Sequence, residues 1–329
     1  MANLIEREIK GKCYFYLEKN IKLGKGRWKK VSIYLGKKKP SKKELKPKET
    51  ELEKKVKAVL ETFYEKRLKK FKYSFLSRKE LNEVERLKDN FFFRFNKLAE
   101  NKKEDFNRKQ AIDFVYTTLR TEGVDVNFSD VETAYRVLKK KRGEFTFNEK
   151  VVVSGSMLSG FDFLSKIKIN KKDIFRLHGI IMSYFEDKTP GQIRDDQRII
   201  ARFNPLTLKR EEINYRTPAP EKVEEELENF FEWFNKNSNI HPLELAALAH
   251  LKIYLIHPFK DGNKRICRLL FNKILQDAGY PLLNISKDTS DYFKALIKSV
   301  ESKNQKNFVK FCYKTFVKQV KNRRLKQGN

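Results

Sequence analysis

Apolar and polar positions alternate near the start of the chain, over residues 12–35. The apolar members of this pattern are Tyr14, Tyr16, Leu23, Val31, Ile33 and Leu35. Gly24-Lys25-Gly26 separates the two runs and favours a tight turn. We therefore predict two strands that form a small β-hairpin. A lysine-rich linker with two prolines is expected to follow over residues 36–47.

Helical spacing replaces the alternation from Thr50 onward. Val56, Leu60 and Phe63 recur at helical intervals, and a later stripe ends at Gly123, which is typical of a helix stop. Further helical segments are expected from Ser129 and over residues 151–164, 174–185, 220–234, 241–256, 266–274, 288–301 and 305–321. Residues 198–203 are β-like, and residues 204–216 look irregular. The fold class is mainly α, with a β-hairpin at the N-terminus and a short hairpin inside the helical domain.

Composition adds a strong positive charge to this picture. The 329 residues include 73 Lys and Arg against 43 Asp and Glu, a formal net charge of +30, and 40% are hydrophobic. The apolar share is enough for a packed core, which excludes wholesale disorder. The first 50 residues hold 16 Lys and Arg against 5 Asp and Glu. The positive charge leaves nucleic acid or another anionic partner open, although no nucleic-acid-binding motif is recognisable.

Neither a membrane segment nor a disulfide framework is indicated. No apolar run approaches the roughly 18–20 residues that a membrane helix needs. The N-terminus lacks the apolar segment of a secretory signal. The three cysteines, Cys13, Cys267 and Cys312, are too widely spaced for a disulfide scaffold or a cysteine-based zinc cluster. We expect a cytoplasmic protein with no membrane partner.

One polar segment between two apolar helices carries the candidate chemistry. It reads His257-Pro258-Phe259-Lys260-Asp261-Gly262-Asn263-Lys264-Arg265-Ile266-Cys267-Arg268. Free backbone N–H groups at the start of the second helix, with Arg265 and Arg268 on one helix face, suit phosphate oxygens. Asp261 offers a hard oxygen ligand for Mg²⁺, and His257 is the nearby candidate for a general base.

This segment resembles the signature of the Fic family, HxFx(D/E)GNGRxxR, at every position except Lys264. Residues 190–194 are similar to the PGxxR segment of that family, and residues 215–220 to its YxPxP-type turn. The segment His241–His250 resembles the family's helix before the motif. The resemblance covers roughly residues 170–321 and implies a Fic-type helical bundle with a β-hairpin flap.

The resemblance implies a protein adenylyltransferase, which transfers AMP from ATP to a Ser, Thr or Tyr hydroxyl of a target protein. His257 would accept the hydroxyl proton, Asp261 would hold Mg²⁺, and Phe259 would anchor the loop. The residues expected to bind the nucleotide are Gly262, Asn263, Lys264, Arg265, Arg268 and Tyr292. A flap over residues 199–208, including Ile199, Ile200, Ala201, Arg202 and Phe203, would hold the target segment by strand-like pairing.

A second family pattern lies upstream. Thr118-Leu119-Arg120-Thr121-Glu122-Gly123 resembles the inhibitory helix (S/T)xxxE(G/N) of Fic proteins. Glu122 would pair with Arg268 and deprive the γ-phosphate of ATP of its arginine. Thr118 and Gly123 complete this inhibitory pattern.

Lys264 is the departure from the family signature. The Doc branch of the superfamily has Asn-Lys-Arg here and resembles a kinase that transfers the γ-phosphate, which is the first alternative. Another nucleotide or phosphocholine donor, or removal of AMP from a modified protein, is also left open. A basic nucleic-acid-binding adaptor with a degenerate core is the non-enzymatic alternative.

The expected organisation has five parts: a basic β-hairpin module (1–40), a charged helical region (41–104), an inhibitory-helix region (105–169), the catalytic core (170–321) and a basic tail (322–329). His178 and His250 lie on apolar helix faces and are interpreted as packed core residues. Self-modification and a homodimer are left open.

Overall fold

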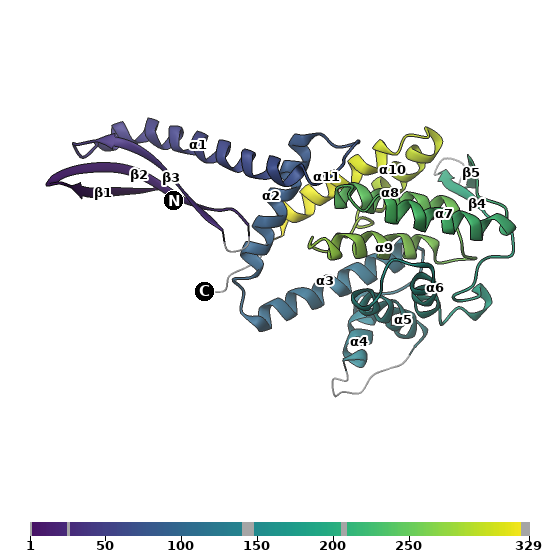
Figure 1. The fold of residues 1–329 in the computed structure, drawn as a ribbon. Helices are drawn as coiled ribbons and strands as arrows, with labels where there is room; N and C mark the ends of the chain where they lie inside the picture. The colour runs from purple at the N-terminus through teal and green to yellow at the C-terminus, as the bar shows by residue number, and fades with distance from the viewer. Residues whose placement is uncertain (1, 25–26, 140–147, 205–208, 324–329) are drawn as a thin grey trace. The chain divides into compact units, whose positions relative to one another are not determined.

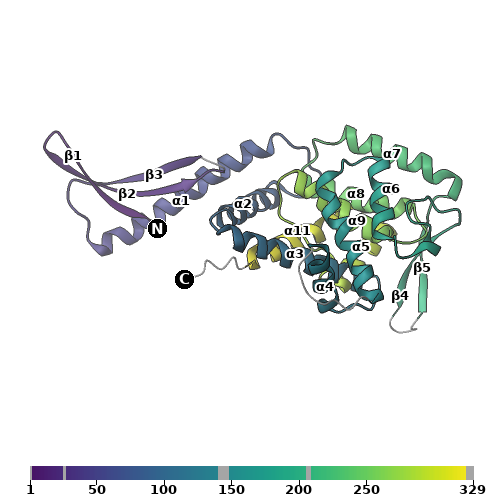
Figure 2. The same cartoon turned by 90° about the horizontal axis from the view of Figure 1, so that it is seen from below.

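The computed structural model describes residues 2–24, 27–139, 148–204 and 209–323. The chain packs as two units (Figures 1 and 2). The first comprises Met1–Phe71 and Arg78–Asp89, and the second comprises Lys72–Ser77 and Asn90–Asn329. The five-part division expected from the sequence stays a prediction.

The first unit contains an antiparallel sheet of three strands, β1 (Asn3–Ile9), β2 (Lys12–Lys22) and β3 (Trp28–Gly36). The expected two-strand hairpin corresponds to β2 and β3. Of the predicted turn, Gly24 has φ +82°, and Lys25 and Gly26 lie outside the described residues. The prediction missed β1, which pairs with β2 along its whole length. Most of β1 is exposed, because it is an edge strand, so its sequence lacks a clear apolar alternation.

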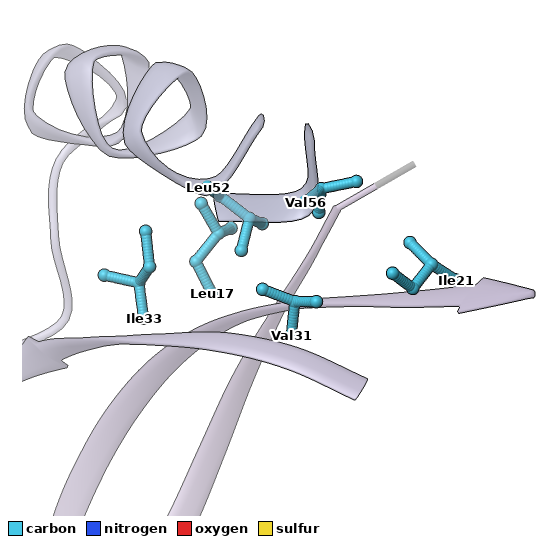
Figure 3. Packing of buried hydrophobic residues seen from close by; sticks show 6 residues of the cluster. All are labelled: Leu17, Ile21, Val31, Ile33, Leu52 and Val56. Atoms are coloured by element: carbon cyan, nitrogen blue, oxygen red, sulfur yellow. The ribbon is translucent and has the colours of Figure 1, made fainter. Parts of the chain in front are cut away.

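One face of this sheet packs against α1 (Lys42–Leu68). Figure 3 shows the cluster, in which Leu17 and Ile33 lie close to Leu52 of the helix. The remaining buried members are Ile21, Val31 and Val56. This cluster forms the core of the sheet and its helix.

The start of α1 corrects the predicted linker over residues 36–47. Ser41 caps the helix: its backbone N–H donates to Glu44 at 2.8 Å, and the Glu44 N–H donates to the Ser41 hydroxyl at 3.4 Å. This reciprocal capping box begins the helix at Lys42, and Pro47 lies inside it. The helical spacing expected from Thr50 onward corresponds to α1, α2 (Arg78–Phe95) and the start of α3 (Glu100–Thr121).

The second unit is a helical bundle, which confirms the mainly α class. Its remaining helices are α4 (Phe128–Leu138), α5 (Glu149–Phe163), α6 (Lys171–Ile181), α7 (Val223–Lys236), α8 (Pro242–Ile256), α9 (Asn263–Asp277), α10 (Thr289–Glu301) and α11 (Lys306–Asn322), with short 3-10 turns at Leu164–Lys166, Glu186–Lys188 and Pro220–Lys222. The helix stop predicted at Gly123 is confirmed: α3 ends at Thr121, and Gly123 has φ +79°. None of the helices described is long and apolar enough to cross a lipid bilayer.

A two-stranded antiparallel sheet interrupts the bundle. It consists of β4 (Ile199–Asn204) and β5 (Lys209–Arg216), with Arg202 opposite Glu211. The β-like segment is therefore confirmed, but residues 209–216 were wrongly interpreted as irregular. The tip of the predicted flap, residues 205–208, lies outside the described residues.

Buried helix α8 lies at the centre of the unit and packs closely on α9. Its start is well formed, because Pro242 occupies the first turn and the His241 ring accepts a hydrogen bond from the Leu243 N–H at 3.3 Å. Glu244 is buried and accepts hydrogen bonds from the backbone N–H groups of the segment that precedes α2, those of Ser74, Phe75 and Leu76. These contacts fix the helix that leads into the polar segment.

Candidate active site

The polar segment forms a tight loop between α8 and α9. His257 ends α8 in a left-handed backbone conformation with φ +51°, and Gly262 precedes α9 with φ +77°. A Cβ atom at Gly262 would lie 2.9 Å from the Met182 sulfur and 3.1 Å from His178 Nε2. Glycine is therefore needed at this position for both its backbone conformation and its size.

Two side chains brace the loop from inside. The Phe259 ring is fully buried and stacks on the His178 ring at 3.7 Å between centroids. Asn263 closes the loop: its side-chain carbonyl accepts from the Phe259 N–H at 3.0 Å, and its side-chain amide donates to the Phe259 carbonyl at 2.7 Å. The first helical residue thereby holds the segment that precedes it.

His178 acts as a structural connector, which fits its interpretation as a packed residue. The Gly191 N–H donates to His178 Nδ1 at 2.8 Å, so the ring proton is on Nε2, which donates to the Asp261 carbonyl at 2.9 Å. Burial lowers the pKa of His178 to about 4. The ring is therefore neutral near pH 7 and ties α6 to the loop.

Arg194 is a positioning residue whose contacts the sequence did not reveal. Its side chain is 1% exposed, and its Nε donates to the His257 carbonyl at 2.7 Å. The same guanidinium donates to the Asp196 carbonyl at 2.6 Å and to the Pro218 carbonyl. One arginine thus joins the loop to both ends of the β4–β5 hairpin.

His257 has the protonation state that a general base requires. Its Nδ1 lies 3.3 Å from the Tyr254 carbonyl, which can only accept, so Nδ1 carries the proton and Nε2 keeps a lone pair. Burial lowers the pKa of His257 to about 4, and the charges of Lys264, Arg194 and Arg198 act in the same direction. The imidazole is neutral near pH 7.

Two arginines of α9 are almost completely buried beside this loop. Arg265 is 2% exposed and pairs with Asp261, with 3.2 Å between Nη2 and Oδ2. The Nε and Nη1 atoms of both Arg265 and Arg268 are buried and have no hydrogen-bond partner among the described residues. Buried guanidinium donors without acceptors are costly, and an anion at the start of α9 would satisfy them.

The predicted ion pair between Glu122 and Arg268 is present. Arg268 Nη2 lies 2.6 Å from Glu122 Oε1, and it also donates to the Thr118 carbonyl at 3.3 Å. Glu122 directly follows α3, and Gly123 allows the chain to turn away. The expected inhibitory residues thus lie against the candidate phosphate site.

Lys264 holds the other oxygen of the same carboxylate. Its Nζ atom lies 3.2 Å from Glu122 Oε2, and the Glu122 side chain is 8% exposed. Burial acts to raise the pKa of Glu122, but the charges of Arg268 and Lys264 outweigh it and keep this pKa below its usual value. The sequence did not predict this contact for the residue that departs from the family signature.

Tyr292 lies behind Arg268, in the core. Its side chain is fully buried, its hydroxyl lies 3.0 Å from His250 Nε2, and its ring centroid lies 5.8 Å from the Arg268 guanidinium. In this arrangement it supports Arg268, and its expected role in nucleotide binding stays a prediction.

The described flap residues differ in exposure. Ile199 is exposed, whereas Ile200 is buried. Ala201, Arg202 and Phe203 belong to β4, but their side chains lie outside the described residues. Among the strands described, β4 pairs only with β5, so its other edge is available for a further strand.

A shallow hollow of about 650 Å³ is lined mainly by residues of α5 and α6. Ser156, Arg176, Ser183 and Gly191 are among its lining residues, and the α9 cations are not. At the start of α9, Lys264 and Arg268 instead contact Glu122. In this conformation the Glu122 carboxylate therefore lies next to the candidate phosphate-binding groups.

The residues present fit a nucleotide bound with Mg²⁺. In the part of the chain that the structure describes, no cluster of three or more His, Cys, Asp or Glu side chains could hold a metal ion alone. Asp261 is a single, partly exposed carboxylate in the loop. Mg²⁺ commonly takes one or two carboxylates and completes its shell with substrate phosphates and water, which suits Asp261.

The helical unit, its two-stranded hairpin and the braced loop together define a Fic-type fold. Residues 168–275 match the family model described as Fic/DOC family, and this segment is a Fic/DOC family domain. The expected core began at residue 170, close to the matched start.

Curated relatives resemble less than half of the chain. "Protein adenylyltransferase fic-1" of Caenorhabditis elegans is 34% identical over 132 residues, 39% of this chain and 24% of the relative. "Protein adenylyltransferase Fic" of Drosophila melanogaster is 33% identical over 150 residues, 45% of this chain and 28% of the relative. The chain thus spans about a quarter of the length of these curated relatives.

Solved structures share the fold over a longer stretch. Fic-1 (residues 134–508) of C. elegans aligns with a TM-score of 0.59 and 23% identity, covering 86% of this chain and 77% of that chain. A Fic family protein of Desulfovibrio desulfuricans G20 aligns with a TM-score of 0.62 and 21% identity, covering 76% and 74%. At this identity the likeness concerns the fold alone.

Proposed function

We propose that this protein is an adenylyltransferase that transfers AMP from ATP to a hydroxyl side chain of a target protein and is held inactive by Glu122. The observation that carries the proposal is that one segment of the chain holds both a neutral His257 and buried arginine donors that lack acceptors. The curated relatives that carry the name protein adenylyltransferase support the same activity.

His257 is proposed as the general base. Its Nε2 accepts the proton of the target hydroxyl, and the hydroxyl oxygen attacks the α-phosphorus of ATP. The bond from the α-phosphorus to the bridging oxygen breaks, pyrophosphate leaves, and an AMP ester forms on the target. The negative charge of the triphosphate raises the pKa of a neighbouring imidazole, so bound ATP makes His257 a stronger base than it is in the free protein.

The α9 cations are proposed to bind the phosphates. The α9 N-terminus with Gly262, Asn263 and Arg265 would surround the α- and β-phosphates, and Arg268 would bind the γ-phosphate. Asp261 would hold Mg²⁺, which neutralises part of the triphosphate charge when bound. The open edge of β4 would position the target segment by strand pairing.

Glu122 is proposed to compete with ATP. It already occupies both Arg268 and Lys264, and a γ-phosphate at the same place would face its carboxylate. Lys264 therefore has a role that does not require a reversed nucleotide: it is a second cation on the inhibitory carboxylate. Transfer of the γ-phosphate remains the alternative, because the same ammonium could bind a phosphate once Glu122 moves away.

Labelled ATP distinguishes these reactions. The Glu122→Gly variant is incubated with ATP labelled at the α- or γ-phosphate and with a cell extract as the source of targets, and the label in protein is followed in excess of that in the same extract without the variant. We expect retention of the α-label only, and its loss in Glu122→Gly/His257→Ala. Protein that gains only the γ-label would establish the kinase alternative. Folded variant protein that incorporates neither label would refute both transfers.

A further inference from the structure

The sheet of the first unit has one face that α1 does not cover. Strand pairing aligns Tyr16 with Ile5 on one side and with Tyr34 on the other. These residues alternate with the apolar positions that pack on α1, so they share the opposite face, which we call the outer face. Its other members by the same alternation are Asn3, Arg7, Ile9, Lys12, Tyr14, Glu18, Asn20, Lys22, Trp28, Lys30 and Ser32.

Large aromatic side chains are unusually exposed on the outer face. Trp28 is 60% exposed and Tyr34 is 50% exposed. The Tyr34 ring leans on Tyr14 and Tyr16, with 6.2 and 5.4 Å between centroids, and the Arg7 guanidinium lies 4.8 Å above the Tyr16 ring. Several exposed aromatic side chains on one face are typical of a surface that binds a partner molecule.

The charge of this face is positive. Residues 1–40 contain twelve Lys and Arg against three Glu, and the outer face itself carries four of these cations, Arg7, Lys12, Lys22 and Lys30. Among these glutamates only Glu18 belongs to the outer face, and Arg7, Lys30 and Ser32 surround its carboxylate. The other two glutamates lie on the other side of β1, opposite Phe15 and Cys13. A partner that approaches the outer face therefore meets cations and aromatic rings, with the single carboxylate already paired.

We propose that the outer face of this sheet binds in the major groove of duplex DNA. The 11 residues of β2 span about 36 Å, which is enough to cover several base pairs of one groove. Three strands place the outer strand axes about 10 Å apart, comparable with a groove about 12 Å wide. The outer-face cations include Arg7 on β1 and Lys30 on β3, the two outer strands, which would lie nearest the two phosphate backbones.

The ring contacts favour a duplex over a single strand. Proteins that hold single strands stack bases on open aromatic faces. Here the rings of Tyr14, Tyr16 and Tyr34 lean on one another at 44° and 49°, and Arg7 covers Tyr16, so these faces are already in contact. Duplex RNA fits less well, because its major groove is too narrow and deep for side chains to read.

Fluorescence anisotropy with the full chain and a 20-base-pair DNA duplex tests the proposal. The test variant is Lys12→Glu/Lys30→Glu on the outer face, and the matched control is Lys43→Glu/Lys54→Glu on exposed positions of α1, with the same change in net charge. Trp28→Ala/Tyr34→Ala removes exposed rings without a change in charge. Circular dichroism checks that each variant is folded.

We expect duplex binding that weakens with salt, with a slope of log K against log salt of about −3 or steeper. The outer-face charge variant should lose at least tenfold in affinity, the α1 control less than threefold, and the aromatic variant several-fold. His257→Ala should bind DNA normally, which keeps this test independent of the proposed transfer reaction. Absence of binding, equal losses in the two charge variants, or tighter binding to single-stranded DNA, duplex RNA or anionic phospholipid vesicles would overturn the proposal.

Discussion

The outer face of the N-terminal sheet and the loop between α8 and α9 are both rich in cations, but they hold them in opposite ways. On the sheet, charged groups such as Lys30 remain about half exposed. At the loop, Arg268 is completely buried and Glu122 almost so. An exposed charge costs little and interacts through a solvent-screened field, whereas a buried charge is costly unless a partner compensates it. The loop should therefore respond to one bound anion, and the sheet to ionic strength.

Removal of the candidate base should have the largest effect. In the Glu122→Gly background, His257→Ala is expected to lower AMP transfer by about 10²- to 10⁴-fold, the usual contribution of a general base. The measurement is the initial rate of α-label incorporation. Nucleotide affinity, measured by calorimetry, should change little. A rate within threefold of the background would show that another group accepts the proton.

Loss of the Glu122 carboxylate should have opposite effects on stability and on activity. Glu122→Gly is expected to raise labelling severalfold and to lower the free energy of unfolding by about 3 kcal/mol without nucleotide, because Arg268 becomes a buried unpaired charge. ATP should restore much of this loss by binding the folded state. Asp125→Gly is the matched control, since Asp125 is an exposed carboxylate paired with Lys150. If both variants behave alike, the contact of Glu122 with Arg268 neither limits labelling nor stabilises the fold more than an exposed ion pair does.

Acid should destabilise the packing around the loop. His178 and His257 have folded-state pKa values of about 4, below the usual value of 6.5, so between these values the unfolded chain binds more protons and stability falls as the pH falls. From pH 7 to pH 5 each ring should cost up to about 2 kcal/mol.

Denaturant unfolding at these two pH values measures this loss. His178→Gln, which cannot titrate, should lose less stability between pH 7 and pH 5 than the unaltered protein. An identical loss in both proteins would assign the effect to other groups.

Lys264 should have a smaller effect than Glu122. Lys264→Met removes one of two cations from the carboxylate, and because the lysine is 31% exposed we expect labelling to rise by only about threefold. In Glu122→Gly the same substitution should add nothing, since the two residues act through one contact. A fall in the rate of the double variant would instead show that Lys264 binds the nucleotide.

The smallest effect is expected at exposed pairs of the N-terminal unit. Lys57 and Glu61 of α1 are 3.9 Å apart and mostly exposed. Lys57→Ala should leave the denaturant midpoint unchanged within error. A clear shift would mean that surface charge contributes more to this unit than its exposure suggests.

Sequence patterns predicted the helices of the second unit well, because apolar stripes at helical spacing are local. The edge strand β1 was missed, since it is exposed and has no apolar alternation of its own. The beginning of α1 could have been recognised: Ser41-Lys42-Lys43-Glu44 has the spacing of a capping box, which outweighed the nearby prolines.

The candidate site also contains residues that the sequence predicted and residues whose roles it did not. His257, Asp261 and Arg268 followed from one contiguous motif. The bracing roles of His178 and Arg194 depend on contacts across more than 60 residues, which no local pattern encodes. The contact between Lys264 and Glu122 could have been predicted from the sequence. Lys264 lies four residues before Arg268 on one helix, so both side chains lie on the same face.

The left-handed backbone at His257 has an evolutionary consequence. A histidine with φ +51° is under local strain that asparagine or glycine would relieve. Replacement of the imidazole by either residue would relieve this backbone strain, but it would remove the proposed proton acceptor. If His257 has that role, mutation alone would favour more stable, inactive variants, and selection for the proposed reaction would be needed to retain the histidine.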